Sequence, residues 1–205
     1  MNNMSHPGWL IGGGEMGART RALDWAATPL GPLADWPQSL RSAVGMMLVS
    51  RAQVILFWGP EFVVLYNDAY RPVFGGKHPS ALGRPGREAW REIWEQQLGP
   101  LLQGVVDTGE TFWATDLLFG LERHGYLEET YFDISYDPVR DESGNVAGVL
   151  CIVAETTSRV VGPRRLRTLS TLGRVAIQAR SVAEVFESAA QALRDSPEEV
   201  AFALL

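Results

Sequence analysis

The sequence predicts an α+β fold: a five-stranded, mostly antiparallel sheet with small helices and one long helix across it. Three observations predict this class. Short runs rich in β-branched and aromatic residues recur along the chain. A broad apolar stripe at helical spacing stands between the second and third of these runs. The last three runs are joined by turns that are too short for crossover helices, which favours antiparallel pairing.

The composition is typical of a folded globular protein. The chain has 205 residues, of which 46% are hydrophobic and 20% charged. Its net charge of −6 argues against a nucleic-acid-binding surface. The single cysteine, Cys151, rules out an internal disulfide. The sequence shows no export signal and no apolar run of about 20 residues that could span a membrane. We therefore expect a cytoplasmic chain.

Residues 1–50 are expected to form an N-terminal extension with short helices. Residues 15–25 have a helical pattern, and a second helix is expected to start near Pro37, with Asp35 as its N-cap. The sheet region, residues 51–160, starts with a predicted β-hairpin formed by residues 54–58 and 62–66. Asn67 would then cap a brief helix.

The longest predicted helix covers residues 88–106, and its broad apolar stripe is typical of a helix that lies on a sheet. We expect Gly99-Pro100 to bend or interrupt it. Three strands are predicted after it, at residues 111–118, 128–139 and 146–154. The middle strand alternates, which indicates that one of its faces is buried. Its inward positions are Thr130, Phe132, Ile134 and Tyr136.

The last part of the chain, residues 161–205, is predicted to be helical again, starting at about Arg165. Four residues are spaced for a narrow coiled-coil seam, which predicts pairing with a second copy of the chain. This dimer seam is Leu166, Leu169, Leu172 and Ala176. Residues 181–184 have the form of a capping box that opens a second helix, and residues 202–205 read as the start of a strand.

Several motifs, taken in order, resemble the PAS domains of bacterial sensor histidine kinases. The stretch FWGPEFVVLYNDAYRPVFG, residues 57–75, resembles the first two PAS strands and the helix after them. GRPGREAWREIW, residues 83–94, resembles the beginning of the long PAS helix, and DPVRDESG, residues 137–144, resembles the turn between the last two strands. The triplet Glu155, Thr156 and Thr157 resembles the polar exit of the domain, with Glu where Asp is usual.

The resemblance covers about residues 14–160. Its extension motifs, residues 14–16 (GEM) and 36–40 (WPQSL), are similar to a segment that precedes such domains in hybrid sensor histidine kinases. Residues 161–205 resemble a linker helix and the truncated start of a GAF domain. The resemblance implies a sensor of a two-component phosphorelay, which passes a ligand- or partner-induced change to a kinase module further along the same polypeptide. The fragment itself would have no enzyme activity.

The resemblance also implies where a ligand would bind. In a PAS fold the aromatic residues of this chain surround one cavity between the long helix and the sheet. Tyrosine hydroxyls and indole N–H groups would orient the ligand there. The same residues also suit a core filled by its own side chains. The ligand-pocket candidates are Tyr66, Tyr70, Trp90, Trp94, Trp113, Phe132 and Tyr136.

The sequence assigns no cofactor or metal. Haem-binding PAS domains carry their histidine on the long helix, which has none here. A photoactive flavin needs a cysteine beside that helix, whereas Cys151 lies in the last predicted strand. His6, His78 and His124 stand in separate loop-like stretches without the spacing of a zinc site. The glycines of residues 12–17 lack the Gly-Lys-Ser/Thr ending of a phosphate loop.

Two other functions remain open at this stage. The first is a ligand-free dimerisation or protein-interaction scaffold, which would show an aromatic core without a cavity. The second is a small-molecule hydrolase or isomerase using Asp116 or Glu128, although no nucleophile–base pair supports it. The partners we expect are a small-molecule ligand, a second copy of the chain and the downstream kinase, with neither nucleic acid nor membrane.

Overall fold

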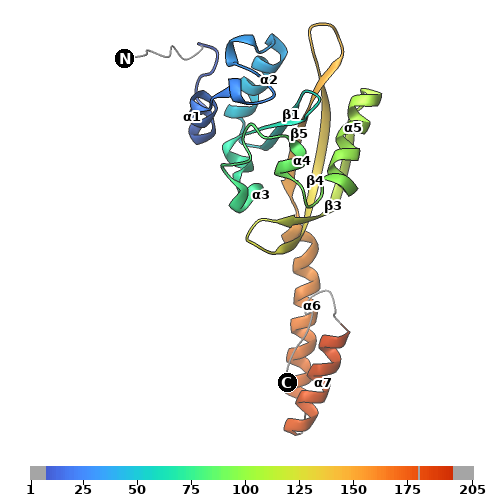
Figure 1. Ribbon diagram of the computed structural model, residues 1–205. Helices are drawn as coiled ribbons and strands as arrows, with labels where there is room; N and C mark the ends of the chain where they lie inside the picture. The colour runs from blue at the N-terminus through green and yellow to red at the C-terminus, as the bar shows by residue number, and fades with distance from the viewer. Residues whose placement is uncertain (1–7, 180, 196–205) are drawn as a thin grey trace. The chain divides into compact units, whose positions relative to one another are not determined.

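The computed structural model describes residues 8–179 and 181–195. The chain divides into two compact units, the first ending at Glu155 and the second beginning at Thr156 (Figure 1). None of the helices in the described part of the chain combines the length and the apolar character that crossing a bilayer requires.

The first unit is built on a five-stranded sheet in which all neighbouring strands are antiparallel, which confirms the predicted fold class. The strand order is β2-β1-β5-β4-β3. The hairpin β1–β2 and the meander β3–β4–β5 meet where β1 pairs with β5. The strands are β1 (Gln53–Trp58), β2 (Val63–Tyr66), β3 (Phe112–Glu122), β4 (Leu127–Arg140) and β5 (Val146–Glu155).

Helical segments between β2 and β3 cover one face of this sheet, which we call the inner face. Residues such as Ile55, Ile134 and Tyr136 alternate onto it and are at most 5% exposed. The segments are η3 (Asp68–Tyr70), α3 (Arg71–Phe74), η4 (Gly75–Lys77), α4 (Gly86–Ala89), η5 (Trp94–Leu98) and α5 (Gly99–Thr108). The buried side chains between these layers form the core of the unit.

The N-terminal extension covers part of the opposite, outer face. Its elements are α1 (Gly14–Ala22), η1 (Trp25–Ala27), η2 (Leu33–Asp35) and α2 (Gln38–Val49). Helix α2 contacts β1 and β2, whose outward residues Leu56 and Leu65 are 0% exposed. In Figure 1, α1 and α2 lie together on one side of the sheet and α5 on the other.

The helix predicted at residues 88–106 is interrupted at Gly99-Pro100, as expected, and is also broken before Trp94, which was not predicted. The chain forms α4, a turn, the π-helical η5 and then α5. Pro100 lacks an amide hydrogen and suits only a first turn, so α5 starts afresh at Gly99. A side chain at Gly99 would also collide with Trp94, because a Cβ there would lie 2.9 Å from the Trp94 carbonyl oxygen.

Two predicted helix caps have different outcomes. Asn67 caps η3 as predicted, since its side-chain oxygen accepts the Tyr70 amide hydrogen bond at 3.1 Å. Asp35 does not cap α2. The N-cap is Pro37, and the exposed Ser39 amide donates to the Glu142 carboxylate at 2.7 Å. Glu142 belongs to the turn between β4 and β5, so the acceptor comes from 103 residues away along the chain.

The second unit consists of two helices that pack on each other, α6 (Thr157–Gln178) and α7 (Val182–Arg194). Helix α6 begins earlier than the predicted start near Arg165. The predicted cap at Ser181 is confirmed, because its hydroxyl accepts the Glu184 amide at 3.2 Å. The strand predicted at residues 202–205 lies outside the described residues.

Candidate functional site

A small cavity lies between the inner face of the sheet and the helices that cover it. Its volume is about 30 Å³, which is room for about two water molecules. The wall is mostly aliphatic and aromatic, and no charged side chain lines it. Of the predicted ligand-pocket residues, the wall contains Tyr70, Trp90, Phe132 and Tyr136.

The other three predicted pocket residues lie elsewhere. Tyr66 is fully buried but does not line the cavity, and its ring centre lies 4.6 Å from that of Phe74. Trp94 packs edge-on against Phe62 at 5.8 Å. Trp113 is 71% exposed on the outer face, so its assignment to the pocket is wrong.

The error at Trp113 has a simple geometric cause. Neighbouring residues of a strand point to opposite faces. Phe112 and Ala114 pair with Tyr136 and Ile134, which face inward, so Trp113 between them must face outward. The sequence alone does not show on which face of β3 this tryptophan lies, because apolar residues occur on both faces of that strand.

The cavity wall holds three buried polar groups that can donate hydrogen bonds. The indole N–H of Trp90 has no partner among the described residues. The hydroxyls of Tyr70 and Tyr136 belong to two other side chains of the same wall. Burial raises the pKa of both tyrosines well above its ordinary value, and does the same for Cys151 in β5. These groups therefore stay protonated, and the cavity is suited to an uncharged molecule with a hydrogen-bond acceptor.

The side chain of Lys77 lies over the ring of Trp90. Its ammonium lies 3.9 Å from the centre of the Trp90 ring, a cation–π contact, and it forms an ion pair with the Glu92 carboxylate. Burial lowers the pKa of Lys77, and the bond to Glu92 partly offsets that effect. Trp90 thus lines the cavity while its ring contacts the Lys77–Glu92 pair and stacks on Phe74, with ring centres 4.5 Å apart.

A second set of contacts joins η4, which contains Lys77, to Arg123 after β3 and through it to the last residue of β5. The backbone carbonyl of Arg123 accepts the Gly76 amide at 2.8 Å. The Arg123 guanidinium bonds Glu155 at 2.9 Å and Glu128 at 3.0 Å. Burial lowers the pKa of Arg123, but its bonds to the two carboxylates outweigh that effect and leave the pKa raised. Arg123 is therefore a fixed cation at the end of β5.

Glycine makes the approach to Arg123 feasible. Gly75 has a φ of +53°, and a Cβ there would lie 2.6 Å from the Arg123 carbonyl oxygen. Nothing in the sequence marks Arg123 as a functional residue, since a lone arginine in a hairpin loop has no distinctive spacing. Its partner Glu155 is the first of the three predicted exit residues. Thr156 is buried, and Thr157 is the first residue of α6.

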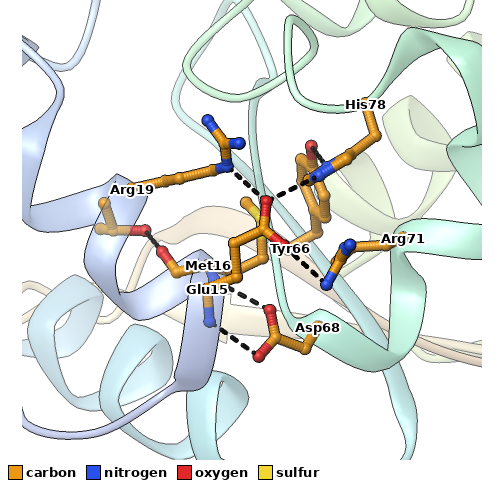
Figure 2. Close-up of polar contacts among 8 residues, drawn as sticks. Glu15, Met16, Arg19, Tyr66, Asp68, Arg71 and His78 are labelled. Carbon is orange, nitrogen blue, oxygen red and sulfur yellow. Dashed lines mark hydrogen bonds and ion pairs between the residues drawn. The ribbon is translucent and has the colours of Figure 1, made fainter.

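A polar cluster attaches α1 to the sheet unit (Figure 2). The Asp68 carboxylate accepts the amides of Glu15 and Met16, at 3.0 and 2.8 Å, and so satisfies the N-terminus of α1. The Glu15 carboxylate in turn meets Arg71 at 2.8 Å and His78 at 3.2 Å. The Gly-Glu-Met motif of the extension therefore binds the Asn-Asp-Ala-Tyr-Arg segment that follows β2.

Two details of this cluster explain its sequence. Gly14 has a φ of +54°, and a Cβ there would lie 1.8 Å from an Asp68 carboxylate oxygen, so no other residue fits without displacing that side chain. A bond from Arg19 is the largest cause that lowers the pKa of Glu15, followed by those of His78 and Arg71. His78 also bonds the Tyr66 hydroxyl, at 2.9 Å.

The predicted dimer seam lies on α6. Leu166 and Leu169 are 68% and 64% exposed, Ala176 is exposed and Leu172 is half-buried. Three of the four seam residues thus present their side chains to solvent in the second unit.

The two acidic residues considered for catalysis, Glu128 and Asp116, take part in hydrogen bonds within the sheet unit. Glu128 accepts hydrogen bonds from Arg123 and His124. Asp116 sits at the β-bulge of β3, where its amide bonds the Asp133 carboxylate at 2.9 Å. Within residues 8–179 and 181–195, no group of three or more His, Cys, Asp or Glu side chains is arranged to hold a metal ion.

Comparison with known proteins identifies the family of the sheet unit. A family model described as "PAS fold" matches residues 49–161. Similar solved structures include an RNA-binding light-oxygen-voltage receptor, with 20% identity, a TM-score of 0.45, and 74% of this chain and 41% of that one covered. The chain therefore spans about two fifths of that receptor's length.

Two further solved structures are also similar. The PAS domain of Bordetella pertussis BvgS has 20% identity and a TM-score of 0.42, with 65% of this chain and 98% of that one covered. A sensory box sensor histidine kinase from Vibrio cholerae has 16% identity and a TM-score of 0.39, with 52% and 82% covered.

Proposed function

This chain belongs to the PAS fold family, and from that premise we propose that it is the sensory part of a two-component histidine kinase. Its cavity would receive a small uncharged molecule that carries a hydrogen-bond acceptor. The observation that carries the proposal is the buried indole N–H of Trp90, which has no partner among the described residues and belongs to a wall that also contains Tyr70 and Tyr136. A buried polar group without a partner costs about 1–3 kcal/mol, which a ligand could recover.

A route from the cavity to the output supports the proposal. Trp90 lines the cavity and carries Lys77 on its outer face. Lys77 ends η4, whose Gly76 amide is bonded to the Arg123 carbonyl. Arg123 holds Glu155, the last residue of β5, and α6 begins two residues later along the chain. A ligand that moved Trp90 would shift Arg123 and alter the start of α6, provided this linkage has two discrete arrangements.

The remaining parts of the proposal concern the parent protein. Helix α6 would pass the change to a kinase module in the same polypeptide, after the GAF-like segment, and the chain would act as a homodimer in the cytoplasm. The fragment would have no catalytic activity of its own. A small-molecule ligand and the kinase would then be its partners.

The test compares the native and denatured masses of the freshly purified chain. We expect extra mass that denaturation removes in the wild type. Ile134→Phe fills the cavity from its wall and should abolish the extra mass, while Ile152→Phe on the outer face should keep it. A wild-type chain without any bound mass, or an extra mass that survives Ile134→Phe, would count against the sensor pocket.

A ligand-free scaffold is the second candidate, and the small size of the cavity favours it. About 30 Å³ is a minor defect in a core of this size, so the aromatic residues come close to filling their own space. The same mass comparison separates the two functions, because a scaffold would be bare and would keep its oligomeric state in Ile134→Phe.

A further inference from the structure

A second, polar pocket lies apart from the cavity under the sheet. Its volume is about 400 Å³, which is in the range of sites for small organic molecules. It is lined by η4 and the residues after it, by α4 and the turn that follows, and by the end of β3. Its charged side chains are those of Lys77, Arg84, Arg91, Glu88, Glu92 and Glu122.

Lys77 is the only lysine among the 18 lysine and arginine residues of the chain. Its ammonium lies 3.9 Å from the centre of the Trp90 ring and pairs with Glu92. Arginine would serve both contacts at least as well, because its guanidinium stacks on aromatic rings and binds carboxylates in a planar fork. What lysine offers and arginine lacks is a nitrogen that can lose its proton and attack a carbon atom.

The Lys77 amine is held at a partly buried place. Its side chain is 24% exposed and that of Glu92 is 9% exposed. The Ser80 hydroxyl and the Ala81 amide both donate to the Lys77 carbonyl, at 2.9 and 3.1 Å, and so fix the backbone that carries the amine. A nucleophile held in one position beside a pocket reacts faster than one that is free to move.

The surroundings of Lys77 also favour its reactive form. Burial lowers the pKa of Lys77, and the nearby Arg123 acts in the same direction, while the carboxylates of Glu92 and Glu122 only partly offset this. A lysine whose pKa is lowered holds a larger share of its amine unprotonated at neutral pH, and only the unprotonated amine is a nucleophile.

Glu92 is placed to move protons at this amine. The Glu122 amide donates to Oε1 of Glu92 at 3.3 Å, and the Lys77 ammonium bonds the same oxygen. Neither of these bonds uses Oε2. A fixed carboxylate beside an amine can accept the proton of the ammonium and later return it to a leaving hydroxyl group.

The charges at the rim indicate the class of molecule. Arg84 pairs with Glu88 at 3.3 Å, whereas the exposed Arg91 offers its guanidinium to the pocket. A guanidinium binds a carboxylate through two parallel hydrogen bonds. The carboxylates of Glu88 and Glu122 disfavour a molecule with further negative charge. A small molecule with one carboxylate and one carbonyl group, an oxo acid, therefore suits both Arg91 and the Lys77 amine.

We propose that Lys77 forms a reversible imine with a small oxo acid bound in this pocket. Glu92 takes a proton from the ammonium. The amine nitrogen then attacks the carbonyl carbon, whose oxygen becomes a hydroxyl with a proton from that nitrogen. Glu92 returns its proton to this hydroxyl, which leaves as water while the C=N bond forms. One ammonium and one carbonyl compound give one protonated imine and one water, so the positive charge over Trp90 is kept.

The inference goes beyond the proposed function and does not rest on it. Lys77 is not part of the wall of the cavity under the sheet. A ligand in that cavity depends on the space beside Ile134, whereas an adduct on Lys77 does not. The two proposals can therefore fail independently.

The experiment traps the imine in the full chain with cyanoborohydride, which reduces it to a stable secondary amine, and uses pyruvate as the probe. Peptide mapping by mass spectrometry separates an adduct on Lys77 from one on the α-amino group. We expect trapping at Lys77 that saturates with pyruvate and is about tenfold or more faster than that of Nα-acetyl-lysine at neutral pH. Lys77→Arg keeps the cation over Trp90 and should abolish the adduct.

Arg91→Ala tests the choice of an acid. It should slow the trapping of pyruvate about tenfold, because a charge-assisted hydrogen bond is lost, and leave the trapping of uncharged propanal unchanged. Arg87→Ala is the matched control, since Arg87 is exposed nearby in α4 but does not line the pocket. It should trap both probes like the wild type.

Two results would overturn the proposal. One is trapping at Lys77 that does not saturate or is no faster than that of Nα-acetyl-lysine. The other is an Arg91→Ala chain that traps pyruvate as fast as the wild type. Circular dichroism checks the folding of each variant. If Lys77→Arg does not fold, the saturation measured on the wild type and the two probes applied to Arg91→Ala still decide the question.

Discussion

The outer face of the sheet has two halves that differ sharply in how they are covered. Over β2 and β1, the N-terminal extension seals it, and Leu56 and Leu65 are 0% exposed. Over β3 and the far end of β5 its apolar residues are exposed, and Trp113 on β3 is 71% exposed. The boundary runs between two paired residues, since Val54 on β1 is 3% exposed and its partner Ile152 on β5 is 42% exposed.

Apolar side chains on a strand therefore do not by themselves show whether that face of the strand is covered by another element. Both halves carry large apolar residues on the same pleated surface. What differs is the attachment of α2, which the buried side chain of Asn67 secures. Its amide nitrogen lies within 3.2 Å of the carbonyls of Met47, Ser50 and Ala52, and its oxygen accepts the amides of Val54 and Tyr70.

Replacing the side chain of Asn67 should change the stability more than any other substitution considered below. Asn67→Leu keeps a similar volume but leaves the carbonyls at the end of α2 and the Val54 amide without their partner. We expect the free energy of unfolding to fall by about 4 kcal/mol, because several buried groups lose their hydrogen bonds together. Urea unfolding followed by tryptophan fluorescence measures it, since all 7 tryptophans precede Glu155.

Asn145→Ala is the control for this substitution, because Asn145 is exposed in the turn between β4 and β5. It should leave the unfolding midpoint nearly unchanged. One ordinary hydrogen bond contributes about 1 kcal/mol. If Asn67→Leu lowers the free energy of unfolding by less than that, α2 is held by packing alone.

The second prediction compares the two halves directly. Leu56→Ala removes a fully buried side chain from the covered half and should cost about 3 kcal/mol in unfolding free energy. Ile152→Ala, on the open half, should cost less than about 1 kcal/mol when measured on the monomer at low protein concentration. Equal losses from the same urea titration would contradict the distinction between the halves.

The smallest expected effect is a pH dependence at the start of α2. The hydrogen bond from the Ser39 amide is the largest cause that lowers the pKa of Glu142. A carboxyl whose pKa is lowered by folding stabilises the folded state above its unfolded pKa, and this contribution is lost as the pH falls through the lowered value. Glu142→Gln should therefore lower the melting temperature slightly near pH 7 and not at acid pH.

Melting curves between about pH 3 and about pH 7 check this prediction, a range that spans ordinary carboxyl titration. The exposed Glu95 serves as the control, through Glu95→Gln. A difference between Glu142→Gln and the wild type that stays constant as the pH falls would contradict the role of the carboxylate.

Local patterns in the sequence predicted the strands and two helix caps, Asn67 and Ser181, well. The alternation of Phe132, Ile134 and Tyr136 identifies the buried side of β4, and Asn67 is recognisable as a cap from its position before a short helix. Gly99-Pro100 marked one break in the helix correctly, but the apolar stripe concealed the earlier break between Ala89 and Trp94. The periodicity was present, but the proline and the packing of Trp94 outweighed it.

The strand runs, the order of the elements and the family can be predicted from residue type and from spacing over short distances. The outward orientation of Trp113 and the contacts of Glu15 with Arg71 and His78 and of Arg123 with Glu155 are visible only in the folded chain. These contacts join residues 32 to 63 positions apart. Local propensity cannot specify them, because they depend on which face each strand presents once the sheet has formed.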